Sequence, residues 1–296
     1  MTNKLQQINR DHLPIRDAAN IVEVLADKGH DTASILDKIG LSPGDFANAA
    51  NVVSREAFDA LLIHALTVLK IPGLGLLVAK KESFSDLGFL GTAIITSSSL
   101  FAAIQNACKF QQITGLLGHF YFDQAGNDAS IVASGLEDDR MKVWSIEAIL
   151  ASWAMVIRYG LGDVASFSSL RLQYANPGYA DMYSEYFKCP VRFLQPRNEL
   201  RFAATLLSRP MKNANASINE VALRQCVKSE LRYAPEQHLL KRVEAILQPS
   251  PMGPPSLETV AAKLGIGTRT LSRRLYECDT TYRQIVRKVN VRVATE

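Results

Sequence analysis

Two arginines and a serine late in the chain stand at a spacing that suits contact with nucleic acid. Arg269, Ser272 and Arg273 fall at positions i, i+3 and i+4 of a short predicted helix, so their side chains share one face. Leu271 and Leu275 lie on the other side and supply an apolar contact. A guanidinium on an exposed helix can reach guanine edges or phosphates in a major groove, so this face is a candidate DNA-binding surface.

The elements around this face have the layout of a helix-turn-helix. Ser256 is a natural N-cap just after Pro254 and Pro255, which break the chain. Gly265 ends the first helix, and a tight turn leads into the second helix over about 268–276. Apolar residues at three- and four-residue spacing predict the buried face of the first helix: Leu257, Val260, Ala261 and Leu264.

Positive charge is concentrated in the same region. Residues 254–296 carry eight Lys and Arg against four Asp and Glu, a net charge of +4, which equals the net charge of the whole chain. Clustered basic charge on a helix-turn-helix is expected of a phosphate-binding surface. The alternative is that two amphipathic helices simply expose arginines to solvent, and the charge distribution favours the nucleic-acid interpretation.

This segment resembles the first helix-turn-helix of AraC/XylS-type transcription regulators. The resemblance implies that the second helix enters the major groove with Arg269, Ser272 and Arg273 facing bases. Arg274 and Thr280 also match, and we include them in the DNA-binding set. The matching residues are Ser256–Glu258, Val260–Ala261, Leu264–Gly265, Arg269–Leu271, Arg273–Leu275, Thr280 and Tyr282–Arg283.

Three departures from that family are visible. Gly267 stands where a serine usually caps the second helix, which costs only a few tenths of a kcal/mol. Asp279 replaces a usual glycine and brings a negative charge near the DNA backbone. The chain ends at Glu296, soon after the start of a connecting helix, so we expect one helix-turn-helix and no second unit. An alternative function follows: a truncated ligand-binding, dimerising protein without DNA binding of its own, which modulates a full-length relative.

The long N-terminal part predicts an α+β domain, with helices and an antiparallel sheet. Apolar residues at helical spacing predict helices within 17–40, 54–69, 99–110, 141–160 and 179–187. Alternating residues predict strands at 119–123, 129–133, 169–174, 191–194 and 199–202, the first two forming a hairpin. The glycines at 73 and 75 lack the lysine-serine ending of a P-loop and follow a helix, which argues against nucleotide binding.

This region resembles the arabinose-binding-like N-terminal effector domain of one AraC subfamily. The resemblance implies a small-molecule sensor and usually a dimer, and it leaves the ligand open. It rests on Gly75–Leu76, Gly88, Leu90–Gly91, Ser97–Leu100, Tyr174–Pro177, Tyr183, Phe187, Cys189–Val191, Phe193, Asn198–Leu200 and Leu207–Pro210.

Four aromatic residues are the candidate lining of the ligand pocket: Phe110, Tyr121, Trp144 and Trp153. The alternative for each is an ordinary core position. Two helices predicted over 217–247 either pack on the sensor domain or serve dimerisation and signalling. The stretch 248–255 is rich in proline, which predicts a stiff linker. We therefore expect an effector domain at 1–247, a linker at 248–255 and an incomplete DNA-binding domain at 256–296.

The sequence gives little support for metal binding, catalysis or membrane insertion. The five histidines and four cysteines have no metal-ligand spacing, and no catalytic motif is present, so we expect no metal, no cofactor and no enzyme activity. No apolar run reaches the length of a membrane span, and the first residues lack the apolar core of a signal peptide. We expect a cytoplasmic protein whose partners are promoter or operator DNA, an effector, a second copy of the chain and RNA polymerase, with no membrane.

Overall fold

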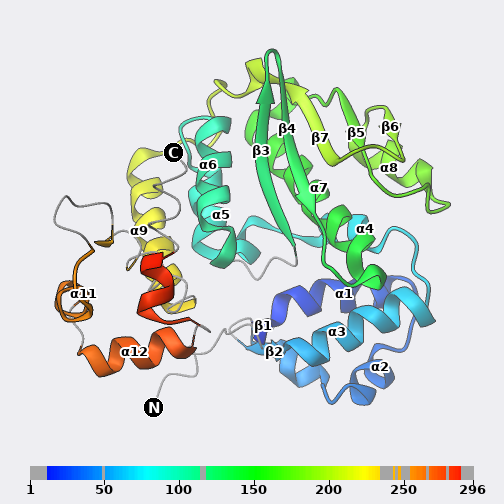
Figure 1. Cartoon of the computed structure of the whole chain (residues 1–296). Coiled ribbons are helices and arrows are strands. Elements are labelled where there is room, and N and C mark those ends of the chain that lie inside the picture. Colours follow the sequence, from blue (N-terminus) through cyan, green and yellow to red (C-terminus); the bar gives the residue numbers. More distant parts are fainter. Residues whose placement is uncertain are drawn as a thin grey trace. The chain divides into compact units, whose positions relative to one another are not determined.

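The computed structural model describes residues 12–48, 51–113, 118–233, 243, 246–247, 254–264, 267–277 and 280–287. The chain divides into two compact units, Met1–Lys228 and Ser229–Glu296. Figure 1 shows their elements, coloured along the sequence. The first unit combines helices with two sheets, and the described part of the second is helical. This confirms the expected α+β domain followed by a small helical unit.

The first unit begins with a helical layer around a two-stranded ribbon. Strand β1 (His12–Pro14) pairs antiparallel with β2 (Val52–Ser54). The helices are α1 (Ile15–Asp27), α2 (Thr32–Lys38), α3 (Arg55–Ile63), which continues as a π-helical turn over His64–Val68, and α4 (Leu74–Lys81). Asp31 caps α2 by accepting from the Ser34 amide at 3.2 Å, and Ser54 caps α3. Their apolar faces form one core, which Trp144 also enters.

A five-stranded sheet is the centre of the first unit, with strand order β3-β4-β7-β5-β6. Its strands are β3 (His119–Ala125), β4 (Asp128–Ser134), β5 (Ser169–Arg171), β6 (Val191–Arg192) and β7 (Asn198–Ala203). The β3–β4 hairpin predicted from the sequence is present, with Phe120 opposite Ala133. The expected antiparallel sheet differs at one edge, because β5 and β6 run parallel. Those two strands are joined through α8 (Ala180–Phe187), a crossover that brings the second strand back in the same direction.

One face of this sheet is covered by helices. The remaining helices of the unit are α5 (Gly88–Ile95), α6 (Leu100–Phe110) and α7 (Asp139–Leu161), with 3-10 turns at Pro43–Ala47, Phe84–Leu87, Gln111–Ile113, Gly162–Val164 and Ala204–Leu206. Phe120, Ile131, Leu170 and Leu200 point to these helices and are buried in the largest apolar core. The Ser99 hydroxyl caps α6 by accepting from the Ala102 amide at 3.2 Å.

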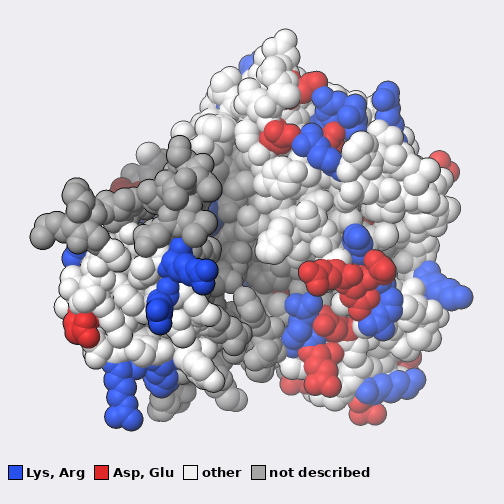
Figure 2. Space-filling model, viewed as in Figure 1, with Lys and Arg blue, Asp and Glu red and all other residues white. Residues whose placement is uncertain are grey.

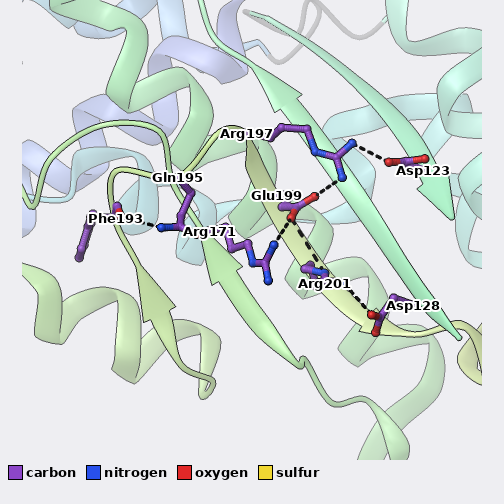
Figure 3. Close-up of polar contacts among 8 residues, drawn as sticks. All are labelled: Asp123, Asp128, Arg171, Phe193, Gln195, Arg197, Glu199 and Arg201. Atoms are coloured by element: carbon purple, nitrogen blue, oxygen red, sulfur yellow. Dashed lines mark hydrogen bonds and ion pairs between the residues drawn. The ribbon is translucent and has the colours of Figure 1, made fainter. Parts of the chain in front are cut away.

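The other sheet face carries charged side chains in register. Glu199 on β7 pairs with Arg171 on β5, and Arg201 is its neighbour two residues along β7. Glu199 is only 3% exposed, because arginine side chains cover it. Arg197 forms ion pairs with Glu199 at 2.8 Å and with Asp123 at 2.6 Å, and Arg171 lies 3.3 Å from Glu199 (Figure 3). These side chains link three strands, β3, β7 and β5, on the face that lacks helices.

Helix α9 (Ala216–Tyr233) crosses the division between the two units. Its first part packs on the first unit, since Ala222 and Cys226 are buried in that core. The Asn219 side chain donates to the Ala93 carbonyl at 2.6 Å. This agrees with the packing alternative for the first of the two predicted helices.

The second unit contains α11 (Leu257–Leu264) and α12 (Thr268–Glu277). Val243 and Leu247 are buried in the same apolar cluster as both helices. The sequence placed these two residues in the effector domain, whereas the compact units divide at Lys228 and Ser229, because these side chains extend the helix-turn-helix core. Residues 248–253 of the expected linker lie outside the described residues. Of the helices that the structure describes, none is both long and apolar enough to cross a membrane.

Candidate functional site

Helix α12 presents one apolar face and one polar face. Leu271 and Leu275 are fully buried in the apolar cluster of their unit. Arg269, Ser272 and Arg273 are exposed on the side of α12 away from those leucines, as the sequence predicts. Neighbouring turns therefore offer two guanidinium groups and a hydroxyl, which can bond base edges or phosphates.

Tyr276 extends this polar face by one turn. It completes an i, i+3, i+4, i+7 series with Arg269, Ser272 and Arg273, and 79% of it is exposed. Tyr276 was not among the DNA-binding residues predicted from the sequence, although its spacing of three residues from Arg273 places it on the same helix face. The four residues are called the α12 face below.

The other predicted DNA-binding residues have different positions. Thr280 is partly exposed, and its amide donates to the Leu275 carbonyl at 3.0 Å, which closes the end of α12. Arg274 belongs to α12, but its side chain lies outside the described residues, as does Asp279. Gly267 accepts from the Leu271 amide at 2.9 Å, so it is the N-cap that the sequence predicts.

Local hydrogen bonds hold α11 and α12 in one folded unit. The Ser256 hydroxyl accepts from the Thr259 amide at 3.3 Å and caps α11. The Tyr282 hydroxyl donates to the Pro255 carbonyl, which ties the residues after α12 to the start of α11. Ile285, 4% exposed, closes the core from that side. The α12 face therefore belongs to a folded unit that has its own apolar core and hydrogen bonds.

The surface of this unit is basic. Five Lys and Arg side chains are described there and all are exposed, while Glu258 is its one described acidic side chain: the five are Lys263, Arg269, Arg273, Arg283 and Arg287. Figure 2 shows Lys and Arg on the visible surface of the chain. Exposed positive charge around an exposed helix face attracts a phosphate backbone before any base is read.

A cavity in the first unit is the candidate effector site. The space free of atoms at this site, open solvent at its mouth included, is about 470 Å³. Eight of the ten lining residues are apolar and two, Glu82 and Ser152, are polar: the apolar ones are Leu87, Leu90, Ile94, Ala107, Phe120, Ile149, Trp153 and Val156. The Ser152 hydroxyl donates to Oε2 of Glu82, so the two polar groups meet at one place in the wall. A small pocket with a few convergent polar groups is the usual form of a ligand site.

The four predicted pocket aromatics do not line one cavity. Trp153 lines the cavity just described, and Phe110 is buried in the same core but is not part of the lining. Trp144 belongs to the separate helical core and contacts the Phe58 ring at 6.1 Å between centroids. Tyr121 is 48% exposed on the uncovered sheet face. Glu82 and Ser152 were missed, although Ser152 interrupts an apolar stripe of α7 that includes Ile149, Trp153 and Val156.

Comparison with known proteins identifies the family of this chain. A sequence profile of the family described as the arabinose-binding domain of AraC transcription regulators, N-terminal, matches residues 29–211. The chain belongs to this family. It is 26% identical over 287 residues to the ornithine utilization regulator of Pseudomonas aeruginosa, covering 96% of the chain and 84% of that protein. It is 34% identical over 153 residues to the transcriptional regulator VqsM of the same species, covering 51% and 47%.

The crystal structure of the transcriptional regulator CdpR from Pseudomonas aeruginosa has the same fold. It aligns with a TM-score of 0.50 at 18% identity, over 94% of this chain and 84% of that one. The present AraC-type protein is a DNA-binding transcription regulator that responds to an effector. Its whole cavity lining, Glu82 to Val156, lies within the matched range, and the α12 face lies beyond it.

Several residues that carry the resemblance of this regulator to its family meet at one buried carboxyl. Glu147 on α7 is 2% exposed and accepts from the Tyr183 hydroxyl at 2.5 Å and the Tyr179 hydroxyl at 2.9 Å. The Gly75 amide donates to its other oxygen at 3.2 Å, and Tyr174 bonds Tyr183 at 3.1 Å. Burial raises the pKa of Glu147 to about 7, against the lowering effect of these hydrogen bonds. The cluster joins α4, α7 and α8, and it is structural rather than a part of the cavity wall.

Proposed function

We propose that the α12 face reads an operator in the major groove and that the cavity of the first unit binds the effector. The observation that carries the DNA-binding assignment is the exposed stripe of Arg269, Ser272, Arg273 and Tyr276 on a helix with its own buried core. The proposed partners are operator or promoter DNA, a small-molecule effector, a second copy of the chain and RNA polymerase. The proposed location is the cytoplasm, and the proposed activity is regulatory, without catalysis.

Fluorescence anisotropy with labelled DNA from the regulator's own promoter tests the DNA contact. Arg269→Ala removes a guanidinium from the α12 face and should weaken binding by about 1–3 kcal/mol if it reads a base. Arg287→Ala removes an equal charge from the same unit away from α12, and we expect a smaller loss that is similar on a scrambled DNA. Binding of the wild type should weaken steeply as salt rises.

Two outcomes would count against this assignment. Affinity that is unchanged in Arg269→Ala, or lowered equally by Arg269→Ala and Arg287→Ala on every DNA, would remove base reading by α12. Absence of DNA binding by the wild type would favour the alternative of a ligand-binding, dimerising protein that modulates a relative. Sedimentation of the same samples tests the proposed homodimer, which the family resemblance supports.

A further inference from the structure

The cavity wall is too poor in hydrogen-bonding groups for a sugar. A pentose buries several hydroxyl groups, and each needs a partner when it leaves water. Apart from the indole N–H of Trp153, the side chains that line the cavity provide two polar groups, Glu82 and Ser152, and these already bond each other. The family is described by arabinose binding, but this lining suits a molecule with an apolar body and one polar end.

The polar end of the cavity holds a carboxyl group with acidic neighbours. Glu82 follows the last residue of α4, where the helix dipole is also negative. Asp86 lies near enough to Glu82 to raise its pKa, and both carboxyl groups lie near enough to Asp17 to raise the pKa of Asp17. Burial, with a contribution from Asp86, raises the pKa of Glu82 against the hydrogen bond from Ser152. Burial also raises the pKa of Asp17 to about 7, an effect that Arg16 opposes and Glu82 and Asp86 increase.

The two lysines that precede Glu82 in the sequence pair with other carboxylates. Lys81 bonds Asp27 at 2.6 Å, and Lys80 lies 3.7 Å from Glu185. Within the part of the chain that the structure describes, no Lys, Arg or His side chain comes within 4.0 Å of the Glu82 carboxylate. The cavity therefore presents a carboxyl group that has acidic neighbours and lacks a cationic partner from the described residues.

Aromatic rings complete the wall around this carboxyl. Trp153 and Phe120 both line the cavity and pack edge to face with 5.3 Å between centroids. Trp153 follows Ser152, the partner of Glu82, directly in α7. Ring faces attract ammonium groups, most strongly when water is excluded. A carboxylate beside aromatic and aliphatic walls is thus a combination that recognises an organic cation.

We propose that the effector is an amphipathic amine, whose ammonium group pairs with Glu82 and whose apolar body fills the space between Leu90, Ile94, Phe120, Trp153 and Val156. This rests on the proposed role of the cavity as the effector site and names the chemical class of the ligand. An anionic ligand is disfavoured by Glu82, Asp86 and Asp17, and a polyol by the apolar wall. On binding, the ammonium supplies the positive charge that the site lacks.

Tryptophan fluorescence of the full chain tests the class with four probes of similar size: 2-phenylethylamine, 2-phenylethanol, 3-phenylpropionate and L-arabinose. We expect the amine to change the emission at the lowest concentration, because Trp153 lines the cavity. Glu82→Gln should weaken amine binding by about 30-fold, since it removes the charged partner while keeping a similar shape. Ser152→Ala, which retains the Glu82 charge, should weaken it less, and Glu56→Gln, an exposed carboxyl on α3, should leave it unchanged.

The outcomes separate this inference from the proposed function. Tighter binding of the alcohol, the carboxylate or arabinose overturns the amine class, yet it keeps the cavity as an effector site if Trp153→Phe abolishes the signal. Equal amine affinity in Glu82→Gln and wild type also overturns it. If none of the probes binds, the amine class fails, while DNA anisotropy still decides the role of the α12 face independently.

Discussion

The hydroxyl of Tyr183 donates to Oε1 of Glu147 at 2.5 Å, and both side chains lie in the interior. A carboxyl so placed is easier to keep protonated than ionised, because desolvation outweighs the hydrogen bonds it accepts. The pair therefore links the stability of the first unit to pH in the neutral range.

The first prediction concerns this linkage. The folded-state pKa of Glu147, about 7, lies above the ordinary value of 4.5, so the folded chain holds a proton that the unfolded chain has released. The free energy of unfolding should fall as pH rises from about 4.5 to about 7, by roughly 3 kcal/mol at most. Urea unfolding of Glu147→Gln should show a flatter dependence than the wild type. Asp17, whose pKa burial also raises to about 7, leaves part of the slope in both proteins. Identical slopes would contradict the prediction.

The second prediction concerns the close approach of α4 to α7. A Cβ atom on Gly75 would stand 2.5 Å from Cβ of Glu147 and 2.6 Å from the Trp144 carbonyl oxygen. Gly75→Ala should therefore destabilise the first unit by about 1–3 kcal/mol, since backbone must shift to make room. Gly44→Ala is the matched control, because its nearest neighbour would be an ordinary 3.5 Å contact. Thermal unfolding of both variants makes the comparison, and equal melting temperatures would refute the steric argument.

A third prediction concerns the covered carboxylate of the open sheet face. Glu199 is 3% exposed and faces Arg171, Arg197 and Arg201. Glu199→Ala should cost about 3 kcal/mol of stability, because three guanidinium groups lose their shared partner. Glu220→Ala breaks an exposed pair with Arg224 on α9 and should change little. Denaturant unfolding distinguishes the two, and a neutral Glu199→Ala would show that water replaces the carboxylate without loss.

The fourth prediction concerns Tyr276. Its position on the α12 face predicts that Tyr276→Ala weakens operator binding by roughly threefold to tenfold through loss of a hydrogen bond or a contact with the DNA backbone. Tyr276→Phe separates the hydroxyl from the ring. Anisotropy on operator DNA measures both, and helix content by circular dichroism controls for folding. If Tyr276→Ala binds operator DNA as tightly as the wild type, Tyr276 does not contact the DNA, and the contact surface of α12 ends before this residue.

The helix-turn-helix could be predicted from the sequence because its helices are defined by residues close together in the chain. Leu271 and Leu275 repeat with the period of one helix, and Ser256 caps the other, so the inward and outward faces follow without knowledge of the rest of the chain. The β3–β4 hairpin, which was also predicted, is local in the same sense. The parallel pairing of β5 and β6 was missed because alternation along a strand is the same in either direction.

The cavity could not be predicted because its wall comes from distant segments. Glu82, Phe120 and Trp153 meet only after α4, β3 and α7 pack together. Aromatic residues such as Trp144 fill cores as readily as they line pockets, so residue type alone did not separate it from Trp153. Glu147 was overlooked for a related reason: a single glutamate in a long helix is usually exposed, and its tyrosine partners lie on α8 and just before it.

One turn of α5 contacts both the cavity and helix α9. Leu90 and Ile94 form part of the cavity wall, while the Ala93 carbonyl beside them receives the side chain of Asn219 from α9. The Thr96 carbonyl, at the end of the same helix, accepts from the Asn215 amide at 2.9 Å. Helix α9 continues without a break past Lys228, so it belongs to both compact units. A ligand that displaces Leu90 or Ile94 would therefore also act on the α5 carbonyl groups that hold the first part of this shared helix.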